Sequence, residues 1–282
     1  MFKLMKLLLP TVAALLAAAP AVAADRISAD TATVIIEKSG VSGQLADFAP
    51  SIRAGITTQP ELASKLTEAQ LATLLQAFDE AYAPARLAAD INAELIRSLK
   101  PAVARDALGW LESELGSRIT ALEDGATELA NDPDKMAAAQ TLMERLPPRR
   151  AERYIALMKA TGADESGAQI MLNSSLGIAY AAAATLSATR PDFDALRKEL
   201  ESSRPQMVEA LGNAYLVMFA SVYQDVAEAD LDRYLAFAES PSGKAYHRAV
   251  TAALDVALTR AAREAGRQVG DAERTRKGRA AA

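Results

Sequence analysis

Residues 110–118 read Trp-Leu-Glu-Ser-Glu-Leu-Gly-Ser-Arg, and residues 237–244 read Phe-Ala-Glu-Ser-Pro-Ser-Gly-Lys. Both stretches have an aromatic residue, then Glu-Ser beginning two residues later, then glycine three residues after the serine. A serine directly before a helix accepts a hydrogen bond from a first-turn N–H, and proline suits the first helical position because its missing N–H would be unpaired there anyway. Each stretch therefore predicts a tight corner between two helices.

The residues that we expect to form these corners fall into two sets. The first copy contributes Trp110, Glu112, Ser113 and Gly116, and the second contributes Phe237, Glu239, Ser240, Pro241, Gly243 and Lys244. The alternative is an anion-binding cradle, in which N–H groups at the helix start act with Lys244 or Arg118. The structural interpretation is favoured because nothing else in the sequence selects the cradle.

Helical periodicity continues through most of the chain. Thr67 followed by Gln70 is a capping-box pattern at the start of one helix. Two sets of larger apolar residues recur at helical spacing, namely Leu71, Leu74, Leu75, Phe78 and Tyr82, and Leu211, Tyr215, Met218, Phe219 and Val222. The chain also has 63 alanines among 282 residues, and alanine is the strongest helix former. These features predict an all-α fold.

The corners belong to a longer repeat. Residues 34–40 and 155–162 are apolar segments that carry a lysine and end in Ser-Gly or Thr-Gly, where Gly40 and Gly162 suit the left-handed position after a helix. These glycines precede Gly116 and Gly243 by 76 and 81 residues respectively. We therefore predict two tandem copies of a multi-helix unit, arranged as a helical bundle or array. The predicted organisation is a signal peptide at 1–24, a first unit at 28–128, a connector at 129–150, a second unit at 151–270 and a disordered basic tail at 271–282.

With these motifs, each copy resembles the bacterial family catalogued as domain of unknown function 2059. Its members are exported, all-helical proteins whose units end in an aromatic-x-x-Ser-Pro-x-Gly-x-Lys helix. The first copy departs from this pattern in having Glu114 in place of the proline. It also differs from the second copy, because Arg118 follows Gly116 by two residues whereas Lys244 follows Gly243 directly. The resemblance implies export and a helical fold, and it implies no activity.

The N-terminus has the features of a secretory signal. Lys3 and Lys6 precede an apolar stretch, and the small residues of Ala21-Val22-Ala23 offer cleavage before Ala24, with Val22-Ala23-Ala24 and cleavage before Asp25 as the alternative. We expect a periplasmic protein, with no stable transmembrane segment in the mature chain because no later apolar run is long enough. Removing the two lysines changes the formal charge from −5 to −7, which argues against nucleic acid as a partner.

The basic stretch 260–279 opposes this acidic balance, with seven bases and three acids. It could contact anionic lipid or an acidic partner. The simpler interpretation is a solvated helix end that frays into a polar tail.

The residue inventory removes most catalytic chemistry. The chain has no cysteine and one histidine, His247, so thiol nucleophiles, Cys-ligated metals and multi-His sites are excluded. Ser240 and His247 could share a helix face, but no nucleophile elbow accompanies them. We interpret His247 as a surface or boundary residue, and we expect no enzyme, no metal and no cofactor.

The function that we predict is a non-enzymatic periplasmic interaction module whose partner is an envelope protein or lipid. The alternative is a carrier of an apolar small molecule or lipid between helices. One segment bears on this choice, because residues 177–184 consist largely of alanine and glycine. Such residues favour close helix packing, and a narrow apolar groove is the alternative.

Overall fold

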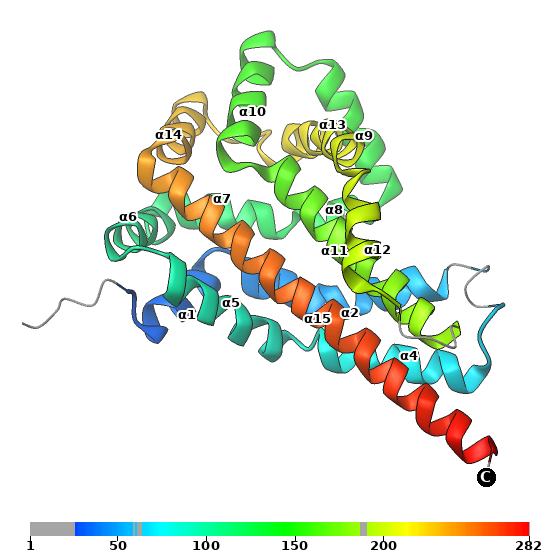
Figure 1. Cartoon of the computed structure of the whole chain (residues 1–282). Coiled ribbons are helices and arrows are strands. Elements are labelled where there is room, and N and C mark those ends of the chain that lie inside the picture. Colours follow the sequence, from blue (N-terminus) through cyan, green and yellow to red (C-terminus); the bar gives the residue numbers. More distant parts are fainter. Residues whose placement is uncertain (1–25, 59, 61–63, 187–190, 282) are drawn as a thin grey trace, which may run out of the picture.

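The fold is all-α, as the sequence predicts. The computed structural model describes residues 26–58, 60, 64–186 and 191–281, and every regular element in these ranges is a helix (Figure 1). The predicted signal peptide at 1–24 lies outside the described residues. In chain order the helices are α1 (Ala29–Lys38), α2 (Val41–Thr57), α4 (Glu68–Ala81), α5 (Pro84–Ser98), α6 (Pro101–Leu111), α7 (Glu114–Asp124), α8 (Ala126–Ala130), α9 (Pro133–Glu144), α10 (Pro148–Thr161), α11 (Ala163–Leu186), α12 (Phe193–Glu201), α13 (Arg204–Val222), α14 (Glu228–Glu239) and α15 (Pro241–Ala281).

Local chemistry sets several of the helix boundaries. Both halves of the predicted capping box are present at α4, where Thr67 accepts from the Gln70 N–H and the Gln70 side chain accepts from the Thr67 N–H. Gly40 and Gly162 have φ angles of 74° and 67°, and they are the only positive-φ positions among the described residues. Glycine adopts this backbone without steric cost, which lets the chain leave α1 and α10 and begin the next helix at once.

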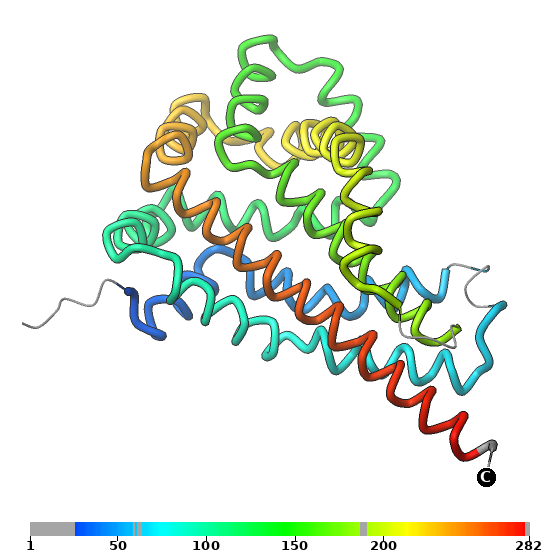
Figure 2. The backbone as a smooth tube through the Cα atoms, viewed as in Figure 1, coloured from blue at the N-terminus to red at the C-terminus, as the bar shows by residue number. Residues whose placement is uncertain are grey.

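Helix α15 organises the molecule. It has 41 residues, which corresponds to a length of about 60 Å. Figure 2 shows this helix, in orange and red, crossing the whole structure with the cyan and teal segments of α4 and α5 beside it. It also packs against α6 and makes its most extensive contact with α11.

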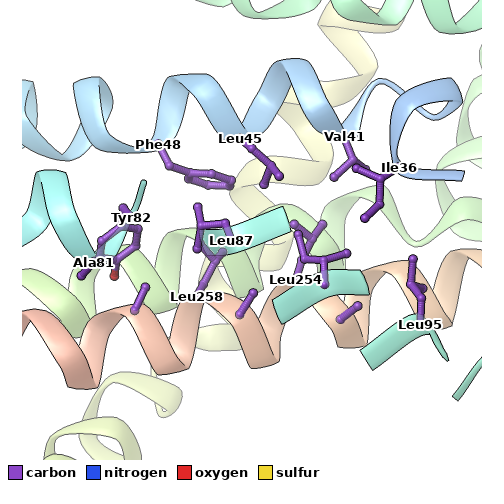
Figure 3. Packing of buried hydrophobic residues seen from close by; sticks show 14 of the residues in the cluster. Ile36, Val41, Leu45, Phe48, Ala81, Tyr82, Leu87, Leu95, Leu254 and Leu258 are labelled. Atoms are coloured by element: carbon purple, nitrogen blue, oxygen red, sulfur yellow. The ribbon is translucent and has the colours of Figure 1, made fainter. Parts of the chain in front are cut away.

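A first hydrophobic core joins the first predicted unit to α15. Buried apolar side chains from α1, α2, α4, α5 and α6 form one cluster with residues of α15 from Tyr246 to Val269. Figure 3 shows Leu45 and Phe48 of α2 pointing toward Leu87 of α5 and Leu258 of α15. The final helix of the second unit therefore completes the core of the first unit.

A second hydrophobic core combines one helix of the first predicted unit with helices of the second. Leu115 and Ile119 of α7 cluster with buried residues of α10, α13 and α14, among them Tyr154 and Tyr223. The last helix of the first predicted unit thus lies in the core of the second. The ranges 28–128 and 151–270 are consequently not separate packing units.

The predicted connector at 129–150 also has structure. It contains α9, which packs against α13, and the first residues of α10. Asp132 caps α9 by accepting from the N–H groups of Asp134 and Lys135.

Small residues let α11 and α15 approach closely, as the alanine-rich segment 177–184 predicts. Ala181 is fully buried in the first core beside alanines of α15. A Cβ added at Gly266 would lie 2.1 Å from Cδ1 of Tyr180, and one added at Gly177 would lie 2.6 Å from the Tyr82 hydroxyl. A larger side chain at Gly266 would push α15 away from α11, and one at Gly177 would push α11 away from the aromatic residues at the end of α4.

The prediction of a disordered tail at 271–282 is wrong for residues 271–281, because α15 continues as a helix to Ala281. Arg267 pairs with Asp271 at 2.9 Å across one helical turn, and Arg276 pairs with Glu273. Glu273 is buried and accepts a bond of 3.4 Å from Gln70 at the start of α4. The bases that looked like a solvated tail therefore belong to an ion-paired helix end docked on α4.

Within the described part of the chain, we find no helix that combines the length and the apolar character needed to cross a bilayer.

Replacing a core leucine of α15 should measure how far this helix holds the first core together. Leu258 is 1% exposed, so we expect Leu258→Ala to lower the free energy of unfolding by about 2–5 kcal/mol in chemical denaturation. Leu142→Ala on α9 is the matched control, because Leu142 is 37% exposed and should lose less than about 1 kcal/mol. Equal losses at the two sites would contradict the role assigned to α15.

Candidate functional site

The two predicted corners have the same geometry. Ser113 Oγ accepts from the Gly116 N–H at 3.0 Å and donates to the Trp110 carbonyl at 2.6 Å. Ser240 Oγ makes the equivalent bonds, accepting from the Gly243 N–H at 2.9 Å and donating to the Phe237 carbonyl at 2.7 Å. Each serine therefore ends one helix and caps the next.

Glycine is required at both corners. A Cβ added at Gly116 or Gly243 would lie 2.0 Å from the carbonyl oxygen of Trp110 or Phe237, respectively. Backbone passes backbone at this point, so no side-chain movement could relieve the clash. This packing is the reason for the shared Ser-x-x-Gly spacing.

The charged residues of the motif lie on the surface. Glu112, Glu239 and Lys244 are exposed, as is Pro241 at the start of α15. Arg118 pairs with Asp230, and the Gly116 and Gly243 N–H groups bond to the capping serines. Arg118 and the two glycine N–H groups are therefore already engaged, so the anion cradle would have to depend on Lys244 and the remaining first-turn N–H groups.

The two corners lie against each other through their aromatic residues. The ring centroids of Trp110 and Phe237 are 4.9 Å apart with an interplanar angle of 9°, and Trp110 stacks on Tyr234 at 5.3 Å. Such offset stacks contribute about 0.5–1.5 kcal/mol beyond the area that they bury. The sequence predicts each corner separately, and the structure brings them together.

A cavity of about 280 Å³ begins at this aromatic stack. Its walls come from both predicted units, chiefly from the second half of α7, the first turns of α11 and α15, α13, and the turns after α1 and α10. Most of the lining is apolar or aromatic, with a few hydroxyls and one carboxylate. Such a lining is typical of small-molecule sites.

Residues at equivalent positions of the two predicted copies line the cavity. Aligning the chain on Gly40 with Gly162, and on Gly116 with Gly243, places equivalent residues of both copies on the cavity wall. Seven pairs do so: Ser39 and Thr161, Val41 and Ala163, Gln44 and Ser166, Trp110 and Phe237, Ile119 and Tyr246, Thr120 and His247, and Glu123 and Val250. The cavity therefore lies at the junction between the two predicted copies.

Glu123 is the charged residue of this wall. Its Oε1 accepts from the Tyr223 hydroxyl at 2.6 Å and from the Tyr234 hydroxyl at 3.0 Å. Burial raises the pKa of the Glu123 carboxyl; the two tyrosine hydrogen bonds lower it and the nearby Asp124 raises it further. The carboxylate is held in place by neutral donors, without an arginine or lysine.

His247 is a boundary residue that turns its ring inward. It lines the cavity, and the ring lies 5.0 Å from Tyr246 and 6.2 Å from Phe237, centroid to centroid. Its Nε2 is buried and has no hydrogen-bond partner among the described residues. Burial lowers the pKa of His247 to about 4, so the imidazole is neutral at neutral pH.

Sequence reasoning found the corners and missed the cavity between them. One signal was available, because Tyr215, Phe219 and Tyr223 recur every four residues and mark one helix face rich in aromatic side chains. Glu123 offered no signal, since it is one of 36 acidic residues. Across the described ranges, no cluster of three or more potential metal ligands is found.

The corner geometry predicts the effect of adding one methyl group. We expect Gly243→Ala to destabilise the protein by about 1–3 kcal/mol, because the new Cβ would meet the Phe237 carbonyl oxygen. Gly109→Ala in α6 is the control, since its Cβ would meet nothing within 4 Å and alanine favours helix, so we expect a gain of up to about 1 kcal/mol. Denaturation of both variants tests this, and a neutral Gly243→Ala would contradict the corner.

The buried imidazole predicts a pH dependence of stability. Below about pH 6.5 His247 takes up a proton in the unfolded chain, whereas in the folded protein it does so only near pH 4. The folded state binds fewer protons in this window, so stability should fall as pH drops from 6.5 to 4, by up to about 3 kcal/mol.

His247→Leu should lack this component. The free energy of unfolding of both proteins is measured in urea between pH 4 and 7. The difference between the two pH curves gives the contribution of His247, because Glu123 contributes equally to both proteins. Parallel curves would contradict the neutral, buried imidazole.

No profile of a known family, no characterised protein and no solved structure matches this chain. The resemblance to domain of unknown function 2059 therefore stays a prediction that depends on the motifs quoted above.

Proposed function

We propose that this protein is an exported, non-enzymatic binding protein of the periplasm, and that its central cavity holds a small ligand. The observation that carries the proposal is the cavity itself, built from equivalent positions of the two copies where the corners meet. This is the second of the two functions expected from the sequence. A junction of two repeats is a common place for a ligand site because both units contribute walls to it.

The size of the cavity limits the ligand. A cavity of 150 Å³ lined by apolar side chains can hold benzene, and ligand sites commonly span about 300–1,000 Å³. At about 280 Å³ the central cavity suits a molecule about the size of two fused rings. A membrane lipid with two acyl chains is far larger, so we propose a small molecule in place of a lipid.

The chemistry of the wall favours binding over catalysis. Ser240 uses its hydroxyl in the corner, where it donates to Phe237 and accepts from Gly243. Ser240 therefore has no free proton to give to His247, and a nucleophile of the Ser–His type would require that transfer.

Export and tandem duplication complete the proposal. Export is supported by the signal-like residues 1–24. Duplication is supported by the matched corners and by the equivalent residues of the two copies that line the cavity. An envelope protein or lipid that binds the basic end of the chain is less well supported. Arg267, Arg274 and Arg276 pair with acids of the same helix, so that end offers less free charge than the sequence suggests.

Filling the cavity tests the proposal. Indole matches the cavity in size, and we expect it to bind the wild-type protein in calorimetry or ligand-observed NMR. Val250→Phe places a ring into the cavity from α15 and should weaken indole binding at least tenfold.

Val256→Phe provides the control for this experiment. Val256 lies on the same helix and is likewise half-buried, but it does not line the cavity, so indole affinity should be unchanged. Equal indole affinity in the two variants, or a wild-type protein that binds neither indole nor a small cation of similar size, would overturn the proposed function.

A further inference from the structure

The cavity collects aromatic side chains from across the chain. The protein has one tryptophan, seven tyrosines and six phenylalanines, and half of these fourteen residues line this one cavity. They are Trp110, Tyr215, Phe219, Tyr223, Tyr234, Phe237 and Tyr246. An aromatic ring carries negative electrostatic potential on its faces, so a wall of rings attracts an apolar or cationic group.

The charge on the wall has one sign. Glu123 is the only acidic residue of the lining, and no lysine or arginine joins it among the described residues. The two tyrosines hold Oε1, and for Oε2 we find no hydrogen-bond partner in the described part of the chain. One carboxylate oxygen therefore stays available to a ligand.

His247 does not supply the missing positive charge. Burial keeps its imidazole neutral at neutral pH. The nearest charged group of α7 is Asp124, which is itself acidic and adds to the negative potential around Glu123. A partly buried carboxylate without a counter-ion is disfavoured, which is why desolvation raises the pKa of Glu123, and a cation bound beside it would favour the charged form.

We propose that the ligand of this cavity is a small organic cation, a quaternary ammonium or protonated amine, held by the aromatic wall with Glu123 as its counter-charge. This rests on the proposed function and narrows it to one chemical class. Aromatic faces together with one carboxylate are the groups that recognise such cations, because the rings replace water around the methyl groups while the carboxylate balances the charge. A purely apolar ligand would leave Oε2 of Glu123 without a partner.

Two probes of the same shape separate charge from size. Choline is the cation, and 3,3-dimethylbutan-1-ol is its neutral counterpart, with a carbon in place of the nitrogen. We expect the full-length protein to bind choline at least tenfold more tightly than the neutral alcohol in calorimetry at pH 7.

Two substitutions on α7 assign the preference to Glu123. Glu123→Gln keeps an oxygen that can accept from Tyr223 and removes the charge, so choline affinity should fall about tenfold while affinity for the alcohol stays unchanged. Glu114→Gln makes the same chemical change on the exposed side of α7, outside the cavity, and should leave both affinities unchanged. Thermal unfolding of each variant confirms that it is folded.

The outcomes distinguish this inference from the proposed function. Equal affinity for choline and the alcohol, or binding of indole without binding of choline, would overturn the inference that the ligand is a cation. The cavity would still be a binding site. Failure of indole, choline and the alcohol alike would overturn both.

The source of the ammonium group is tested separately. Phosphatidylcholine vesicles that sediment with the wild-type protein and not with Glu123→Gln would support a lipid headgroup as the source. Binding of free choline without vesicle binding would support a free small molecule.

Discussion

The exchange of final helices between two cores is the constraint on which the rest of the structure depends. Each capped corner directs the chain out of its own unit, so that α7 enters the core around Tyr154 and α15 enters the core around Leu87. Neither core is complete without the helix that the other unit supplies. The two corners must therefore lie side by side, and the stacked rings of Trp110 and Phe237 are the contact between them.

The cavity follows from this arrangement. Where two exchanged helices diverge from a common contact, residues about two to four turns beyond each corner face a shared space. Small residues close the remaining contact, since glycine and alanine let α11 and α15 approach along much of α11. In the proposed function, the differences between the two predicted copies matter most: Glu123 aligns with Val250, and His247 aligns with Thr120, so the wall carries one carboxylate and one imidazole.

Sequence reasoning succeeded where the cause is local. The capping box at Thr67, the left-handed glycines at 40 and 162, and the Ser-x-x-Gly corners depend on residues within four positions of one another. It failed at the end of the chain, where residues 271–281 looked like a solvated tail. There Glu273 is buried and bonds to Gln70, a contact across 203 residues that periodicity and charge counts do not contain.

The sequence by itself determined that the chain is helical, where several helices begin and end, and which chemistries its lone histidine and missing cysteines exclude. Only the tertiary structure decided which helix completes which core, that half of the aromatic residues surround one cavity, and that Glu123 is the carboxylate placed there. The physical reason is the sequence separation over which each interaction acts. Helix caps and turns are set by bonds over three or four residues, whereas burial and electrostatic environment depend on segments more than a hundred residues apart.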